Sequence, residues 1–144
     1  MNDLRKIGFW CLGSPACKGS THAFKSKTTG KIVTLPMDKK LKLWTAQIRI
    51  AASERWPGGA TQRPCRIVMS FVFARPKSHY TAKGSIKPTA PPAPRKDWDK
   101  LARAVGDALT SVVYADDVLV VDARVTKRWD DTLTGVFIVV EELA

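Results

Sequence analysis

The chain has 144 residues, of which 44% are hydrophobic and 26% charged, a composition typical of one globular domain and not of a disordered chain. No apolar run approaches the roughly 18 residues that span a bilayer, and the charged N-terminus is not followed by the features of a secretory signal. We therefore expect neither a membrane protein nor a secreted one. The formal net charge of +11 is typical of proteins that bind polyanions, most often nucleic acid, although a solvated basic surface without a partner would also explain it.

The charges are unevenly distributed along the chain. Residues 1–96 contain 19 basic and three acidic side chains, whereas residues 97–144 contain five basic and ten acidic ones. Carboxylates repel the phosphates that a basic surface attracts, so a gathering of acids beside such a surface suggests bound metal ions.

The first half of the chain predicts a strand, a hairpin and a helix. Residues 6–12 form the expected strand, and residues 22–26 and 31–35 form a hairpin that turns through residues 27–30. Asp38 is a plausible N-cap of a helix that runs to about Arg55. Its apolar residues recur at helical spacing and are predicted to be core: Leu41, Trp44, Ile48 and Ala51.

Residues 66–74 are apolar on both faces, as expected of a central strand. The next segment, 75–96, has no structural period and no acidic residue, but it contains four closely spaced prolines and several basic residues. We interpret it as a mobile, basic, proline-rich arm that reaches phosphates; a plain flexible loop is the alternative.

The second half predicts a helix from residue 98 to about 112, a strand over 118–127, a turn over 129–135 and a last strand over about 136–141. The helix has one apolar face, formed by Leu101, Ala104, Val105, Ala108, Leu109 and Val112. This order of elements predicts a single α+β domain over residues 1–144, with a mixed β-sheet flanked by two main helices.

The cysteines give little evidence of chemistry. The chain has three cysteines, Cys11, Cys17 and Cys65. An odd number without a secretory signal favours reduced thiols in a cytosolic protein. With only His22 and His79 as additional ligands, the spacing is poor for a structural zinc site.

The candidate chemistry lies in Asp97 and Asp99, at the start of the second helix, and in Asp116 and Asp117, which follow it. Mg²⁺ prefers carboxylate oxygens, and phosphodiester hydrolysis uses such an ion to activate water and to stabilise charge. Acids at a helix start also act as caps. Spacing alone does not decide between metal binding and capping.

The segment Arg95-Lys96-Asp97-Trp98-Asp99-Lys100-Leu101, continuing to Asp107-Ala108-Leu109 and then Tyr114-Ala115-Asp116-Asp117, closely resembles the RusA family of Holliday-junction resolvases. The similarity continues through Val120-Val121-Asp122, and residues 75–80 with the proline-rich arm look like phage-type members.

This resemblance implies a dimeric, Mg²⁺-dependent endonuclease, with Mn²⁺ also possible, that nicks four-way DNA junctions symmetrically in a bacterial or phage-infected cell. Asp97, Asp99 and Asp117 would be the essential metal carboxylates and Asp116 would support them, whereas Asp107 would be structural. The basic helix residue Arg103 would join the catalytic group. The expected DNA contacts are Lys77, His79, Tyr80, Lys83, Lys87, Arg95, Lys96, Lys100 and Arg103.

The chain also departs from the family pattern. Lys100 replaces an asparagine, Leu119 replaces a frequent glutamine, and Arg103 replaces a lysine. Arginine keeps the charge and can clamp a phosphate, but it does not readily transfer a proton. Gly106 stands at a mid-helix position, where glycine costs roughly 1 kcal/mol relative to alanine.

A helix from residue 98 to 112 would separate its ends by roughly 20 Å. Unless the chain doubles back after a shorter helix, one protomer cannot readily join both aspartate pairs around a metal ion. A two-fold dimer could bring Asp97 and Asp99 of one chain to Asp116 and Asp117 of the other. Two alternatives remain open: a non-catalytic basic DNA-binding module, and a nuclease for other branched DNA.

Overall fold

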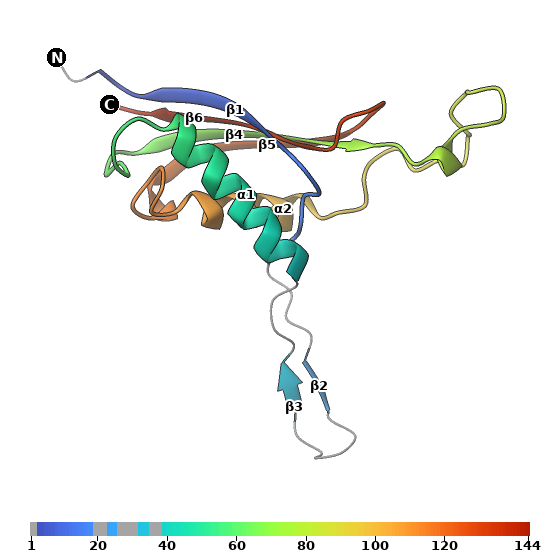
Figure 1. The fold of residues 1–144 in the computed structure, drawn as a ribbon, viewed down its shortest axis with the longest axis horizontal. Helices are drawn as coiled ribbons and strands as arrows, with labels where there is room; N and C mark the ends of the chain where they lie inside the picture. Colours follow the sequence, from blue (N-terminus) through green and yellow to red (C-terminus); the bar gives the residue numbers. More distant parts are fainter. Residues whose placement is uncertain (1–2, 19–22, 26–31, 35–38) are drawn as a thin grey trace.

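A four-stranded mixed sheet forms the centre of the computed structural model, which describes residues 3–18, 23–25, 32–34 and 39–144 (Figure 1). The strands are β1 (Lys6–Leu12), β4 (Cys65–Ala74), β5 (Val120–Asp130) and β6 (Gly135–Glu142), in the order β1-β6-β4-β5. Strand β6 is antiparallel to both β1 and β4, whereas β5 is parallel to β4. Two short strands, β2 (Ala23–Lys25) and β3 (Ile32–Thr34), pair antiparallel in a separate sheet.

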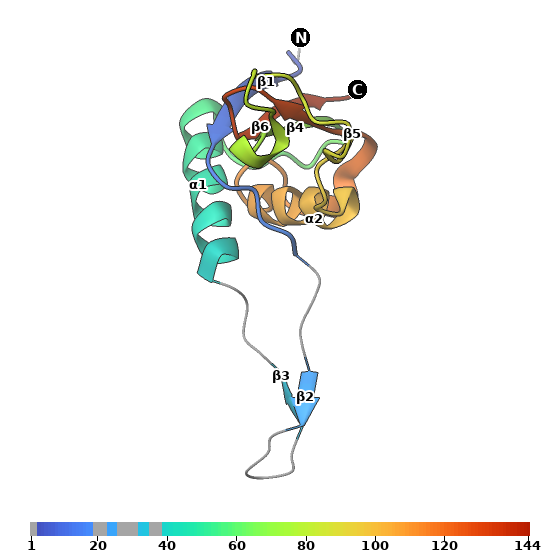
Figure 2. The same ribbon diagram turned by 90° about the vertical axis from the view of Figure 1, so that its right-hand side faces the viewer.

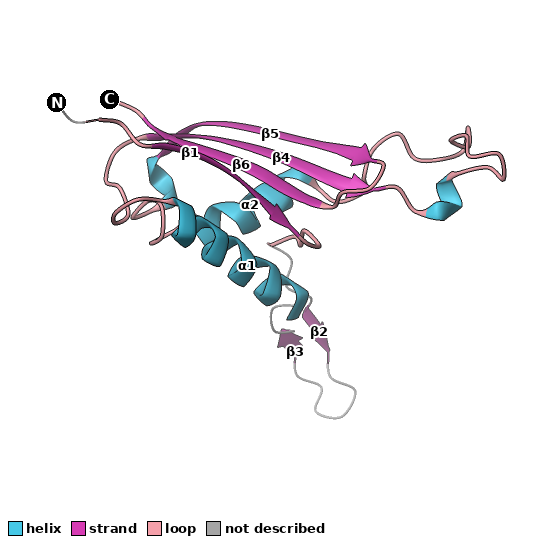
Figure 3. Ribbon diagram, turned by 45° about the horizontal axis from the view of Figure 1, so that its top comes forward, coloured by secondary structure: helices cyan, strands magenta, loops and turns pink. Residues whose placement is uncertain are grey.

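Two helices, α1 (Lys39–Arg55) and α2 (Trp98–Leu109), cover one face of the sheet (Figures 1 and 3). The core lies between the layers, because alternate strand residues point toward the helices: Phe9 and Cys11 of β1, Ile67, Met69 and Phe71 of β4, and Val136, Ile138 and Val140 of β6. The predicted α+β fold with a mixed sheet and two helices is confirmed.

Helix α1 buries Leu41, Trp44, Ile48 and Ala52 against β1 and α2. The predicted core residue Ala51 is only partly buried, because the buried stripe drifts by one position at the end of the helix. The predicted cap Asp38 and the hairpin residues 22, 26–31 and 35 lie outside the described residues.

Helix α2 ends at Leu109, three residues before the predicted end at residue 112. Thr110 has an extended backbone, with ψ of 133°, and Ser111 is left-handed, with φ of 71°. Arg49 of α1 donates hydrogen bonds from Nη1 to the carbonyl oxygens of Ala108 (3.0 Å) and Thr110 (2.9 Å). These bonds satisfy carbonyl groups that the end of a helix otherwise leaves unpaired.

Strand β5 begins at Val120 and not at residue 118, because Asp117–Leu119 form a 3₁₀ turn, η2. It also continues to Asp130, since Trp129 and Asp130 pair with Phe73 and Ala74 of β4. The prediction of a turn at residues 129 and 130 is therefore wrong; the turn begins at Asp131.

The arm, residues 75–96, extends beyond one end of the sheet (Figures 1 and 3). It contains a 3₁₀ turn, η1 (Lys77–His79), and a bridge between Tyr80 and Ile86. Trp129 anchors its base: the indole donates to the Pro91 carbonyl oxygen (2.9 Å), the His79 ring lies edge-on at 5.1 Å and the Arg75 guanidinium lies 5.3 Å from the ring centre. The predicted mobility of the arm stays a prediction.

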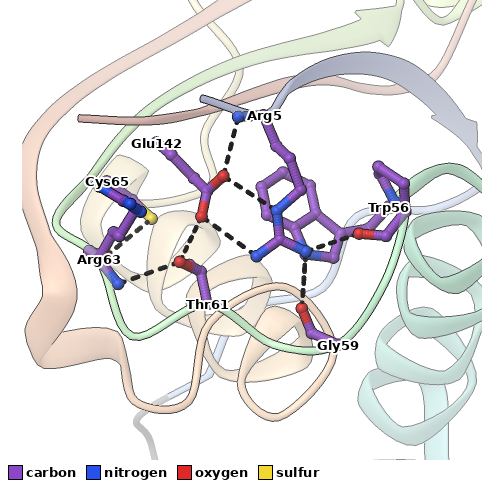
Figure 4. Close-up of polar contacts among 8 residues, drawn as sticks. Arg5, Trp56, Gly59, Thr61, Arg63, Cys65 and Glu142 are labelled. Atoms are coloured by element: carbon purple, nitrogen blue, oxygen red, sulfur yellow. Dashed lines mark hydrogen bonds and ion pairs between the residues drawn. The ribbon is translucent and has the colours of Figure 1, made fainter. Parts of the chain in front are cut away.

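An ion pair between the buried Glu142 and the partly buried Arg5 joins the beginning of the chain to β6 (Figure 4). Arg5 donates from Nε to the carboxylate of Glu142 (2.9 Å), and Thr61 donates its hydroxyl to the same carboxylate (2.5 Å). The Arg5 guanidinium also bonds the carbonyl oxygens of Pro57 and Gly59 and lies 4.5 Å from the Trp56 ring centre. The network fixes the loop after α1 against the sheet.

In the described part of the chain, no helix is long and apolar enough to cross a bilayer.

Candidate active site

Asp97 and Asp99 lie at the beginning of α2. Asp97 occupies the N-cap position, yet its side chain accepts no capping hydrogen bond, and the side chain is 61% exposed. The Lys100 ammonium lies 3.4 Å from one Asp97 carboxylate oxygen. Asp99 is exposed in the first helical turn. Helix capping therefore does not explain Asp97.

Asp116 and Asp117 lie just before β5, beside the last turn of α2. Asp116 does act as a cap, because its carboxylate accepts from the backbone N–H of Val118 (3.1 Å). A hydrogen bond with Asp116 raises the pKa of Asp117, and partial desolvation and the negative charges of Asp116 and Asp107 raise it further. A pKa raised in this way identifies a concentration of negative charge that a bound cation would relieve.

We call Asp107, Asp116 and Asp117 the C-terminal acidic cluster. Lys18 balances part of the negative charge of this cluster. Its ammonium forms an ion pair with Asp107 and lowers the pKa of Asp117 electrostatically. The backbone N–H of Lys18 also donates to the Lys100 carbonyl oxygen (3.1 Å), so the chain after β1 runs along α2. Sequence reasoning missed Lys18 because nothing local to it indicates a partner in α2.

The structure does not bring the two aspartate groups together within one protomer. Helix α2 has 12 residues, so a rise of about 17 Å separates its ends. Asp97 and Asp99 stand at the beginning of α2, Asp107 lies about 12 Å further along the helix axis than Asp99, and Asp116 and Asp117 follow the helix. Over the residues that the structure describes, no three His, Cys, Asp or Glu side chains are arranged to hold a metal ion.

The predicted DNA contacts occupy α2 and the arm. Arg103 is exposed one turn after Asp99, on the same side of α2. Lys96 donates its ammonium to the Pro15 carbonyl oxygen (2.8 Å), and His79 and Tyr80 are half-buried at the base of the arm. The remaining arm cations are exposed: Lys77, Lys83, Lys87 and Arg95. Because His79 packs against Trp129 it supports the arm, and contact of its ring with DNA stays a prediction.

Two clefts flank Lys96. One, of about 780 Å³, lies between the end of β1 and α1, and the other, of about 340 Å³, lies under the arm beside Trp129. Among the residues that the structure describes, no acidic side chain lines either cleft. Asp97, Asp99, Asp116 and Asp117 are instead exposed at the surface.

A small α+β domain with exposed aspartates among basic side chains is compatible with a nuclease that acts on polynucleotides, and comparison with known proteins supports this class. The model of the endodeoxyribonuclease RusA family matches residues 15–141. The chain belongs to the RusA family of endodeoxyribonucleases, which confirms the resemblance carried by residues 95–122. It is also 28% identical over 133 residues to the uncharacterized protein YqaN of Bacillus subtilis (strain 168), covering 87% of this chain and 89% of that protein.

Proposed function

We propose that the protein is a Mg²⁺-dependent endodeoxyribonuclease that resolves four-way DNA junctions by paired nicks during recombination and repair. Mn²⁺ would substitute for Mg²⁺, and the site of action would be the cytoplasm of a bacterial or phage-infected cell. The observation that carries the proposal is Asp97, an exposed carboxylate at a helix N-cap without a capping bond, in a chain of the RusA family.

The donor set fits a hard cation. Asp97, Asp99 and Asp117 are exposed carboxylates. The hydrogen bond with Asp116 raises the pKa of Asp117 most, and partial desolvation and the negative charges of Asp116 and Asp107 raise it further. When bound there, Mg²⁺ would polarise a phosphoryl oxygen and acidify a water molecule. Lys100 beside Asp97 and Lys18 beside Asp107 balance part of the negative charge in the protein itself. Asp116 would orient Asp117 through the hydrogen bond between their carboxyl groups.

The complete site would be shared across a homodimer. The aspartate groups at the two ends of α2 are each incomplete as a metal site, and large apolar side chains flank both groups: Trp98 is 59% exposed, Val118 74% and Val121 63%. An isologous contact that places Asp97 and Asp99 against the partner's C-terminal acidic cluster would bury these apolar side chains and complete two equivalent sites. Two symmetric sites suit a junction that is cut at two positions.

The basic side chains would hold the substrate. Arg103 presents a charged, planar donor group one turn from Asp99, where it would clamp a backbone phosphate without transferring a proton. Lys77, Lys83, Lys87 and Arg95 would contact a junction arm beyond the end of the sheet.

A synthetic four-way junction and a linear duplex of matched sequence, each incubated with and without Mg²⁺, test the proposal. We expect nicks only in the junction and only with the metal. Asp97→Asn and Asp117→Asn should each abolish cleavage, because each removes a ligand, while junction binding is kept or tightened, because less charge repels phosphate. Asp131→Asn, an exposed aspartate in the β5–β6 turn, is the matched control and should cut normally.

Cleavage by Asp117→Asn at the wild-type rate would refute the metal assignment. Junction binding without cleavage in any divalent metal would identify a DNA-binding module instead. Cleavage of flaps or forks in preference to junctions would identify a nuclease for other branched DNA.

A further inference from the structure

The face of the sheet opposite the helices has no described element packed on it (Figures 1 to 3). The register places side chains of all four strands on this open face. Trp10 of β1 lies opposite Phe137 of β6, which lies opposite Ser70 of β4 and, beyond it, Thr126 of β5. The open face is therefore continuous along the row from Trp10 to Thr126, whereas Val72, one row further along β4, is only 1% exposed.

Two aromatic rings form the centre of the β1–β6 half. Trp10 is 45% exposed, and its ring centre lies 5.2 Å from that of Phe137, at an interplanar angle of 48°. The Phe137 ring extends over Gly8: a Cβ atom on Gly8 would lie 3.2 Å from the ring. Since glycine has no side chain, nothing from position 8 covers the Phe137 ring. Leu12, 55% exposed, continues this apolar surface along β1.

The β5 edge of the same face is cationic. Arg124 and Arg128 alternate with Thr126 on the exposed side of β5. Arg128 lies 3.2 Å from Asp130, whereas Arg124 forms no ion pair with any described residue. On the β4 strand, Arg66 is neutralised by Asp122 (2.7 Å) and Glu141 (3.5 Å). The free charge of the open face is thus concentrated near Arg124.

Adjacent strands are about 4.8 Å apart, so Trp10 on β1 lies roughly 14 Å from β5 across the sheet and Phe137 on β6 roughly 10 Å. A single strand of a few nucleotides is long enough to span these distances, at about 3.4 Å per stacked base. Exposed rings on a sheet and arginines at its edge are the two components by which proteins bind unpaired nucleotides: bases stack on the rings, and cations contact the phosphates. We propose that the open face binds single-stranded DNA, with bases on Trp10 and Phe137 and phosphates at Arg124 and Arg128.

Charge favours DNA over a second copy of this chain as the occupant. The two carboxylates of the central rows, Asp122 and Glu141, already pair with Arg66. Asp130 pairs with Arg128 in the same way. Two copies packed face to face would therefore bury Arg124, which has no ion pair with any described residue, without a free acid to meet it, whereas a polyanion would satisfy it. The protein would then bind unpaired strands at a site that is separate from the carboxylates of the proposed active site.

The test is the affinity for a fluorescent 15-nucleotide oligothymidylate, measured by anisotropy in EDTA, so that neither cleavage nor the metal site affects the result. We expect Trp10→Ala to weaken binding about ten-fold or more, and Trp10→Phe to keep most of the affinity. Ile50→Ala, which truncates an exposed apolar side chain on α1, is the control and should bind normally. Arg124→Ala should reduce the slope of log affinity against log salt by about 0.7, and Arg55→Ala should not.

Photocrosslinking of wild-type protein to an oligonucleotide with 5-iododeoxyuracil, followed by peptide mapping, gives a readout that no variant can disturb by misfolding. Crosslinks to Trp10 or Phe137 support the proposal. Crosslinks confined to other elements, or unchanged affinity in folded Trp10→Ala, overturn it. Loss of a dimer by Trp10→Ala with unchanged affinity for the oligonucleotide also overturns it, because the face would then be an interface between copies.

Discussion

Glu142 carries a negative charge in a buried position, and its partners determine the response of the protein to acid. Its side chain is 4% exposed, and the hydrogen bonds from Arg5 and Thr61 lower its pKa from 4.5 to about 2. A carboxyl group whose pKa is lower in the folded state than in the unfolded state stabilises the folded state at pH values above the pKa of the unfolded state. We expect a contribution on the order of 3 kcal/mol, present above pH 4.5 and lost as the pH falls toward 2.

Urea unfolding at a series of pH values measures this contribution. Glu142→Gln should lower the free energy of unfolding at pH 7 by about 2–4 kcal/mol, because it leaves Arg5 without a charged partner, and should make stability less dependent on pH between 5 and 2. Glu141→Gln, next to it but partly exposed, is the control and should cost less than about 1 kcal/mol. Equal pH profiles for wild type and Glu142→Gln would show that the ion pair does not stabilise the fold.

Gly106 lowers the stability of α2 because glycine is a poor helix former, and no close packing at this position requires the absence of a side chain. Its carbonyl oxygen accepts from the hydroxyl groups of Tyr114 (2.6 Å) and Thr110 (3.1 Å), and a Cβ atom would meet only the Tyr114 hydroxyl oxygen, at an ordinary 3.7 Å. Gly106→Ala should therefore raise the free energy of unfolding by about 0.5–1 kcal/mol, as measured by thermal or urea unfolding. Ala102→Gly, in the same helix, should lower it by a similar amount. A loss of stability in Gly106→Ala would mean that Tyr114 requires the absence of a side chain.

At the scale of elements, Trp129 links the arm to the sheet. Neutralising Lys83, Lys87, Arg95 and Lys96 together should reduce the dependence of junction affinity on salt, by roughly 3 to 4 in the log–log slope if each contacts a phosphate. Trp129→Ala keeps these charges but removes one of the anchors of the arm, the other being Lys127, which donates to the carbonyl oxygens of Pro94 and Lys96. We expect it to weaken binding with a smaller change in slope. An unchanged slope in the quadruple variant would exclude the arm from the DNA interface.

The helices and strands themselves were largely predictable, because the apolar periodicity of an element and the glycine and proline residues that end it are local in sequence. Such patterns predicted the strand over residues 6–12, the end of α1 at Arg55 and the central strand β4. The end of α2 at Leu109 depends instead on Arg49, 59 positions before Ala108, and the pairing of Arg5 with Glu142 joins residues 137 positions apart. The same limit applies to the candidate site: the aspartates lie in local motifs, whereas Lys18 contributes only through the tertiary fold.

At the scale of the whole molecule, the separation of the two aspartate groups predicts complementation between variants. In a mixture of Asp97→Asn and Asp117→Asn proteins, a heterodimer would contain one intact shared site and one site with both changes. We expect the mixture to nick one strand of a junction, although each variant alone is inactive, and gel analysis of end-labelled strands would show the single nick. If subunit exchange is verified and the mixture stays inactive, each site belongs to one chain.

The strand order has a consequence for how the molecule is made. Strand β6, the last in sequence, lies between β1 and β4, so the first strand has no neighbour in the sheet until residues 135–142 are available. During synthesis, α1, β4, the arm and α2 all leave the ribosome before the central strand that joins the sheet. Formation of the sheet is thus coupled to synthesis of residues 135–142, and chains that stop before them would lack the strand that joins β1 to β4. A nuclease built in this order would acquire its activity only after β6 has been synthesised.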